Sequence, residues 1–273
     1  MTQTREQTAR RAHSPFIDEL LALVQYRPLL KNLVERDLKV RYKRSVLGFF
    51  WTLLNPLLMM VVFSIVFSAF FRFSMEGFVI YFLSAYLLWT FFSQSTVASM
   101  TSILRSGSLI KKIYVPKAVF VVATIISGLV NLGLAMVPLL VILLVTDSQV
   151  GWALLFLPVP VALTALFTLG VSLLLSAVAV FFYDVIEIYQ VLLTAWMYLT
   201  PIFYPLDIVP ERYRVFIRLN PMFYLVETFR APIHNGSLPS MQHVAYGGLA
   251  ALVSLLLGWW FFSRSADRFA YYV

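Results

Sequence analysis

Six long apolar stretches run through this 273-residue sequence, and they leave the chain few ways to fold. Glu187, near the start of the fifth stretch, is the one charged residue inside them. A helix of roughly 20 residues crosses the hydrocarbon core of a bilayer, and only helices or closed barrels satisfy the backbone there. The sequence therefore predicts an all-α integral membrane protein with six transmembrane helices. Their expected bounds are Phe49 to Phe71, Phe78 to Ser99, Ala118 to Val145, Trp152 to Phe182, Ile186 to Tyr204 and Val244 to Phe262.

Charge is scarce and unevenly placed. Charged residues make up 12% of the chain, about half the share in an ordinary soluble domain. Ten of the 21 Lys and Arg residues precede Leu47, and only five fall in the connections on the opposite side of the membrane. The positive-inside rule then predicts that both termini are cytoplasmic, in a multi-pass protein of the bacterial inner membrane. No apolar core of a cleaved signal peptide follows Arg10 and Arg11.

Residues 28–47 are expected to form an amphipathic helix at the membrane surface, between a cytoplasmic segment (1–27) and the membrane domain (48–273). Pro28 suits a first helical position. A basic amphipathic helix lies in the membrane interface among the lipids. The alternative is a basic segment that only fixes the membrane topology, but this role leaves the amphipathic spacing of its residues unexplained. The apolar side holds Leu30, Leu33, Val34 and Leu38, and the polar side holds Asn32, Glu35, Arg36, Lys39 and Lys43.

Two connections are too long to be simple turns. Residues 100–117, on the cytoplasmic side, contain Gly107 as a helix breaker, followed by apolar and basic residues. They predict a surface helix at about 102–117, with a flexible basic loop as the alternative. Residues 205–240, on the outside, are too polar for a span and too apolar for a solvated loop. They predict short amphipathic or re-entrant helices, separated at Pro210, Pro221 and Pro232.

This chain lacks the residues that several kinds of chemistry require. There is no cysteine, and the three histidines are scattered. No G-x-x-x-x-G-K-[ST] phosphate-binding loop occurs, and the spans lack the ionisable residues that ion-coupled carriers use. We therefore expect no catalytic residue, metal or cofactor in this chain and no nucleic-acid partner. Any use of ATP and Mg²⁺ would take place on a partner subunit.

Aromatic residues make up 16% of the chain, and many lie in or at the ends of the spans. For any one of them, contact with lipid or with a neighbouring helix is the commoner role. As a group they could line a conduit, because aromatic faces stack on sugar rings without fixed hydrogen-bond geometry. The candidates are Phe63, Phe67, Tyr81, Tyr86, Trp89, Tyr189, Trp196, Tyr198 and Tyr204.

Four stretches resemble the membrane subunits of type-2 ABC exporters that secrete polysaccharides, such as the O-antigen, teichoic-acid, capsule and cell-wall galactan permeases. They occur in the family's order, and the similarity covers nearly all of the chain after Pro28. Tyr183 departs from the family, because relatives often carry Arg before the residue equivalent to Asp184. The matching stretches are RDLKVRYKRSVLGFFWTLLNPLL (36–58), LIKKIYVPK (109–117), TPIFYP (200–205) and LNPMFYLVETFR (219–230).

This resemblance implies a homodimer of six-span subunits, each docked on a cytoplasmic ATPase subunit. Its substrate would be a polyprenyl-diphosphate-linked polysaccharide, which enters from the membrane lipids and crosses between the two subunits. The implied entrance for the lipid head comprises Arg36, Lys39, Arg41, Lys43 and Arg44. The implied coupling helix presents Leu109, Ile110, Lys111, Lys112, Ile113 and Tyr114 to the ATPase. The implied external gate contains Pro205, Phe216, Asn220, Pro221, Phe223, Tyr224 and Arg230.

Other functions stay open on the residues alone. An exporter of a small lipid or drug would share the fold and differ in substrate. An integral membrane glycosyltransferase would need clustered carboxylates to hold a metal-bound nucleotide sugar. Asp184 and Glu187 are the one close carboxylate pair near a span, and a solvated turn is their commoner role. A purely structural anchor would leave residues 205–240 unexplained.

Overall fold

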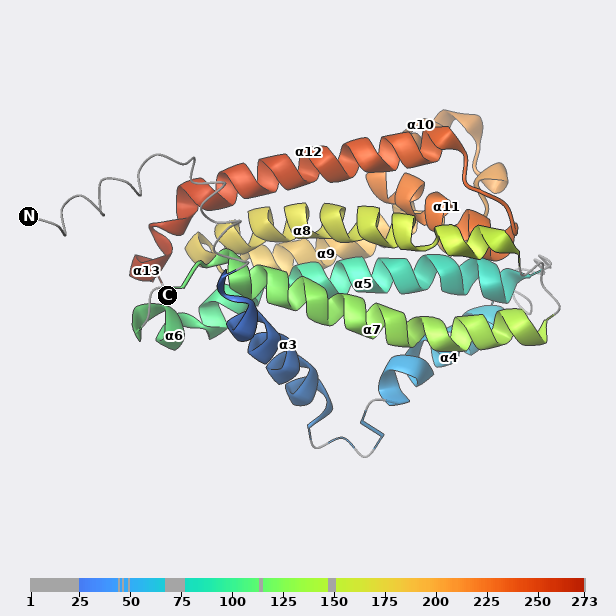
Figure 1. Ribbon diagram of the computed structural model, residues 1–273. Helices are drawn as coiled ribbons and strands as arrows, with labels where there is room; N and C mark the ends of the chain where they lie inside the picture. Colours follow the sequence, from blue (N-terminus) through green and yellow to red (C-terminus); the bar gives the residue numbers. More distant parts are fainter. Residues whose placement is uncertain are drawn as a thin grey trace, which may run out of the picture.

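The computed structural model describes residues 25–43, 45, 47–48, 50–66, 77–112, 115–146 and 151–272. Every regular element in these ranges is a helix, which confirms the predicted all-α class (Figure 1). The longer helices are α3 (Arg27–Tyr42), α4 (Phe50–Ile65), α5 (Phe78–Arg105), α7 (Ala118–Val145), α8 (Pro158–Phe181), α9 (Val185–Leu199), α11 (Pro221–His234) and α12 (Met241–Ala266). The shorter ones are α6 (Gly107–Lys112), α10 (Glu211–Arg218), α13 (Phe269–Tyr272), and the 3₁₀ helices η2 (Trp152–Phe156) and η3 (Leu206–Ile208).

Four helical segments are long and apolar enough to cross a membrane: α5, α7, η2 with α8, and α12. Helix α9 and the described part of α4 occupy the places predicted for the fifth and first spans, with 15 and 16 residues; residues 67–71 of the predicted first span lie outside the described residues. At 1.5 Å per residue each is only about 22–24 Å long. Helix α9 ends before the predicted Tyr204, because Pro201 disfavours helical backbone at Thr200.

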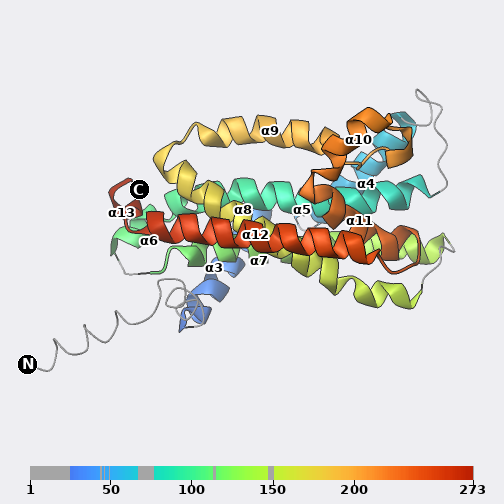
Figure 2. The ribbon, with the colours of Figure 1, turned by 90° about the horizontal axis from the view of Figure 1, so that it is seen from above.

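Helices α5, α7, α8 and α12 run side by side along the long axis of the molecule (Figures 1 and 2). Helix α8 packs against both α5 and α12. Its approach to α12 is closest at Gly170 and Gly258, where a Cβ on Gly258 would lie 2.0 Å from the carbonyl oxygen of Gly170. Large buried side chains of α5, such as Phe82 and Phe92, fill the core. Small residues at the crossing and large residues around it therefore hold the bundle together.

The two long connections lie at opposite ends of this bundle, with α6 and α13 at one end and α10 and α11 at the other (Figure 1). The helix predicted at 102–117 is shorter than expected, because α5 continues to Arg105 and α6 occupies only Gly107–Lys112. Pro210 and Pro221 stand at the starts of α10 and α11, as predicted. The prediction for Pro232 was wrong: it lies inside α11, which continues to His234.

Helices α3 and α4 diverge from the bundle and form a V beside it (Figure 1). Pro28 is in the first turn of α3, as predicted. The break between the two helices includes Gly48, whose φ of 46° lies in the left-handed region that glycine adopts readily. The N–H of Gly48 donates to Oγ of Ser45 over 2.9 Å. This turn redirects the chain from α3 into α4.

Candidate functional site

The predicted apolar side of α3 is present, and it packs against protein. Leu33 is buried in a cluster with Val119 and Phe120 at the start of α7. Leu30 and Val34 are half-buried against the same cluster. These contacts attach α3 to the end of the bundle and direct part of its polar side toward α5.

Of the five cations predicted for the lipid-head entrance, the four that the structure describes do not all face the same space. Arg36 and Arg41 line a cavity. Lys39 is exposed and pairs with Glu35 on the outer side of α3, with 3.4 Å between Nζ and Oε2. Lys43 is exposed as well. Arg44 lies outside the described residues.

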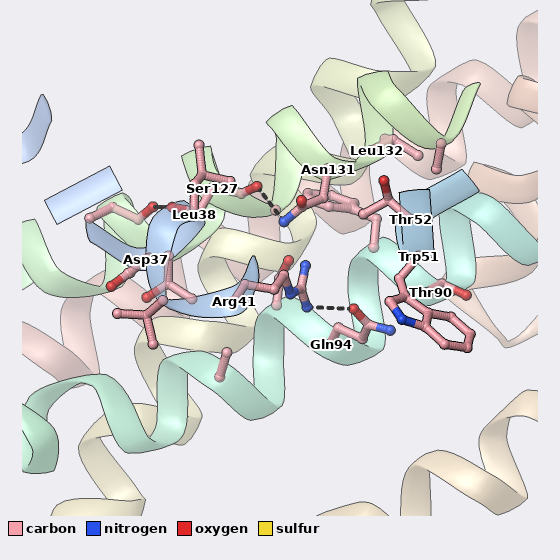
Figure 3. A pocket seen from close by; sticks show the side chains of 18 of the residues that line it. Asp37, Leu38, Arg41, Trp51, Thr52, Thr90, Gln94, Ser127, Asn131 and Leu132 are labelled. Atoms are coloured by element: carbon pink, nitrogen blue, oxygen red, sulfur yellow. Dashed lines mark hydrogen bonds between the residues drawn. The ribbon is translucent and has the colours of Figure 1, made fainter. Parts of the chain in front are cut away.

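The cavity has a volume of about 650 Å³ and lies between α3, α4, α5 and α7 (Figure 3). The divergence of α3 from α4 leaves this space open beside the bundle. Helices α5 and α7 line it with residues three or four positions apart, so each helix contributes a single face. Many lining side chains are polar: Thr90, Gln94, Ser95, Ser102 and Arg105 on α5, Thr124, Ser127 and Asn131 on α7, and Thr52 and Asn55 on α4.

A hydrogen bond crosses the cavity. Nη2 of Arg41 donates to Oε1 of Gln94 over 2.8 Å, which joins α3 to α5 (Figure 3). Arg36 pairs with Asp37, with 3.0 Å between Nη2 and Oδ1. With Arg105, the described residues that line the cavity include three guanidinium groups and one carboxylate, so their net charge is positive.

Four residues that line the cavity were not predicted as site residues: Trp51, Gln94, Arg105 and Asn131. The available signal was the spacing of polar residues inside otherwise apolar helices. Thr124, Ser127 and Asn131, for example, follow the i, i+3, i+7 pattern of one helical face. That spacing identifies a polar face, but it does not say which other helix the face meets.

Most of the candidate channel aromatics lie within the subunit. Tyr81, Trp89 and Tyr189 are buried, and Trp196 packs edge-on against Trp89 at 6.2 Å between ring centroids. Tyr86 is half-buried and lines the cavity. The remaining positions are as follows: Phe63 and Tyr204 are half-buried, Tyr198 is exposed, and Phe67 lies outside the described residues.

Asn220 joins the two proline-containing stretches at the opposite end of the bundle. Its Oδ1 accepts from Nε1 of Trp196 over 2.7 Å and from the backbone N–H of Met222 over 3.0 Å. Its Nδ2 donates to Oγ1 of Thr200 over 2.8 Å. One side chain therefore caps the start of α11 and attaches it to the end of α9.

Arg230 makes a second link between the same stretches and is 2% exposed. Its Nη2 donates to the carbonyl oxygen of Pro201 over 2.7 Å, and its Nη1 forms an ion pair with Glu227. The guanidinium also lies over the ring of Tyr81 on α5. The hydroxyl of Tyr81 donates to the carbonyl oxygen of Tyr204 over 2.8 Å.

The other predicted gate residues surround these two links. Pro221 begins α11, and Phe223 is buried in it. Tyr224 is half-buried, and its hydroxyl donates to the carbonyl oxygen of Arg218 over 2.7 Å. Pro205 precedes η3, and Phe216 on α10 is 61% exposed.

At the α6 end, Leu109 and Ile110 point into the protein. Both are half-buried against the cluster that holds Leu33. Lys111 is exposed, and α13 contacts α6. The side chain of Lys112, and Ile113 and Tyr114 as a whole, lie outside the described residues.

Residues 28–233 match the family described as ABC-2 type transporter. The chain belongs to the ABC-2 type transporter family. It is 34% identical over 239 residues to the O-antigen export system permease protein RfbA of Myxococcus xanthus, covering 87% of this chain and 91% of that protein. It is 26% identical over 245 residues to the protein of that name from Klebsiella pneumoniae, covering 89% and 93%. It is 25% identical over 253 residues to the capsule polysaccharide export inner-membrane protein CtrC of Neisseria meningitidis, covering 89% and 92%.

The ABC-2 match covers the cavity and both links, through Asn220 and Arg230, at the end of the bundle with α10 and α11. It begins at α3 and ends within α11, so all four stretches that carried the resemblance fall inside it. Asp184 and Glu187, the alternative glycosyltransferase pair, lie at the exposed turn before α9 and on its first turn. No group of three or more His, Asp or Glu side chains that could hold a metal ion occurs among the described residues.

Proposed function

We propose that this chain is the transmembrane subunit of an ATP-driven exporter that moves a lipid-linked polysaccharide out of the cytoplasm. The observation that carries the proposal is its similarity, over most of both chains, to a permease named for O-antigen export. Its similarity to a capsule polysaccharide export protein points to the same substrate class. The lipid is expected to be a polyprenyl diphosphate, whose negative charge suits the guanidinium groups of α3.

Energy would come from a separate ABC ATPase that binds ATP and Mg²⁺. Membership of the ABC-2 family supports a membrane subunit that works with a separate ATPase subunit. The end of the bundle with α6 and α13 is the proposed docking surface. Exposed Ser108 and Lys111 on α6 would meet the ATPase there. This arrangement puts both termini in the cytoplasm and makes α10 and α11 an external gate.

A homodimer would supply the conduit. Helix α9 lies apart from α7 and α12 (Figure 2). It exposes large apolar side chains along one side: Ile188, Val191 and Leu192 are 58%, 71% and 57% exposed. A second subunit would cover this side, and α4 and α9 would complete six crossings per subunit within a locally adapted bilayer.

Deletion of the gene in its host, with complementation, tests this function. We expect the surface polysaccharide to disappear and its lipid-linked precursor to accumulate inside, and we expect the tagged chain to co-purify with an ABC ATPase. An unchanged surface glycan together with lost efflux of a small lipid or drug would favour the alternative exporter. Metal-dependent glycosyl transfer by the isolated chain, abolished by Asp184→Asn, would instead indicate an enzyme.

A further inference from the structure

We propose that the cavity between α3, α4, α5 and α7 is a binding site within one subunit for the diphosphate and first sugar of the lipid-linked substrate. The proposal rests on the export function above and adds a specificity-determining role for α5 and α7. It follows from three properties of the walls: their charge, their polar groups inside the spans, and an exposed indole at the opening.

The charge of the walls favours an anion. Arg36, Arg41 and Arg105 face the space together with a single carboxylate, Asp37, which already pairs with Arg36. Guanidinium groups bind phosphate through paired N–H donors. A diphosphate would therefore bind at the end of the cavity where α3 approaches α5.

The polar wall extends beyond these charges into the apolar spans. Gln94 is exposed at mid-length on α5, a helix whose neighbouring residues are largely buried. Asn131 lies at mid-length on α7 and faces the same space, and its Nδ2 donates to the carbonyl oxygen of Ser127 over 2.9 Å within that helix (Figure 3). A primary amide facing lipid would be costly, so polar residues in a span mark a place where a polar ligand or water is held. Two amides with donors and acceptors suit the hydroxyl groups of a sugar.

Trp51 completes a carbohydrate-type site. It is 47% exposed, lines the cavity and lies close to Thr90 and Gln94 in Figure 3. An indole face packs on the C–H face of a sugar while amides bind its hydroxyls. The volume of about 650 Å³ falls within the range of small-molecule sites.

The contact between Arg41 and Gln94 connects the two halves of the site. The guanidinium of Arg41 donates to Oε1 of Gln94 over 2.8 Å. A phosphate that draws Arg41 toward itself frees this oxygen to accept from a sugar hydroxyl. Diphosphate binding would thus make the side-chain amide of Gln94 available to the sugar. A phospholipid without a sugar would not gain this contact.

Binding to the full-length protein in lipid nanodiscs, measured by isothermal titration calorimetry, tests the proposal. The probes are farnesyl diphosphate, farnesyl diphosphate carrying one sugar (N-acetylglucosamine or galactose, tested separately), and short-chain phosphatidylglycerol. We expect at least one sugar-bearing probe to bind about tenfold more tightly than farnesyl diphosphate, and phosphatidylglycerol to bind more weakly than either.

Two kinds of substitution separate the two halves of the site. Gln94→Leu and Asn131→Leu should reduce binding of the preferred probe about tenfold and leave farnesyl diphosphate unchanged. Arg41→Gln should reduce the binding affinity for the preferred sugar-bearing probe and for farnesyl diphosphate about tenfold each. The matched controls are Gln190→Leu on the exposed side of α9 and Lys39→Gln on the outer side of α3, and neither should change binding.

Three results would overturn the proposal: equal wild-type binding of all diphosphate probes, sugar preference retained in both leucine variants, or phosphatidylglycerol binding as tightly as the preferred probe. The first and third results are measured on the wild-type protein alone, so the proposal can still be rejected if a variant misfolds. Wild-type complementation of the surface glycan reports the export function separately. Export without sugar preference would reject the site and keep the function.

Discussion

The guanidinium carbon of Arg230 lies 3.6 Å from the centre of the Tyr81 ring, although 149 residues of sequence separate them. The pair joins α11 to the start of α5 at the end of the bundle that holds α10 and α11 (Figure 1). Because Arg230 is almost completely buried, the ring replaces part of the hydration that the cation loses.

Tyr81→Leu should destabilise the protein by at least about 2 kcal/mol, since it removes a desolvated cation–π contact and the hydrogen bond from the Tyr81 hydroxyl to the carbonyl oxygen of Tyr204. Thermal unfolding of the purified protein measures this loss. The matched control is Tyr213→Leu, because Arg212 lies 4.6 Å from the Tyr213 ring on the exposed helix α10. If the two substitutions lowered the stability equally, burial would not be what strengthens the contact between Arg230 and Tyr81.

Asn220→Ala should cost on the order of 2–4 kcal/mol, because it removes a helix cap and leaves the indole N–H of Trp196 without its acceptor. Denaturation in mixed micelles gives the free energy of unfolding. Asn235→Ala, at the exposed far end of the same helix, should change it by less than about 0.5 kcal/mol. Limited proteolysis between α9 and α11 should accelerate in the Asn220 variant alone.

Gly258→Ala should lower the yield of folded protein sharply, because the added methyl group would overlap the backbone at Gly170. Moving α8 from α12 to relieve the overlap would open the core around both helices, at a cost of several kcal/mol. Gly133→Ala is the control, since no heavy atom lies within 4 Å of its added Cβ. A fully stable Gly258 variant, judged by thermal unfolding, would show that the crossing tolerates side chains.

His234, at the end of α11, should make the stability of the protein sensitive to acid. Burial is the main reason that its pKa is lowered from 6.5, and the nearby positive charge of Arg230 adds to the effect, while Glu227 opposes it. A His with a lowered pKa binds protons more readily in the unfolded state, so stability falls as the pH decreases from about 6.5 toward the folded-state pKa. His234→Gln should flatten this part of the stability profile, measured between about pH 5 and 8.

Substitutions on α6 should separate ATPase coupling from folding. Ser108→Glu with Lys111→Glu changes exposed positions, and we expect a folded protein with loss of export or of ATPase association. Leu109→Asp buries a charge beside Leu33 and should unfold the contact between α3 and α7. Normal export by the double glutamate variant would exclude this side of α6 as the docking surface.

The positions of the apolar helices could be predicted because they depend on local sequence. Helix α7 has the predicted bounds. The apolar side of α3 followed from its spacing for the same reason. The short length of α9 could also have been anticipated from Pro201.

The candidate site was less predictable, because its residues come from four helices. Arg36 and Lys39 are three residues apart on one helix, and only the packing of α3 on α7 turns Arg36 toward the cavity and leaves Lys39 outside. Leu109 was assigned to an ATPase contact, but it is half-buried within the subunit. Spacing along one helix cannot tell which neighbour an apolar side chain meets.

The sequence by itself determined the all-α class, the apolar helices, the basic amphipathic segment and the family, since these depend on hydrophobicity, periodicity and motif order along the chain. Tertiary structure alone decided that Gln94, Asn131 and Arg41 face one space, and that Asn220 and Arg230 lock two proline-containing stretches together. The reason is physical: the crossing of α8 and α12 and the divergence of α3 from α4 depend on the shapes of distant surfaces, which no local pattern specifies.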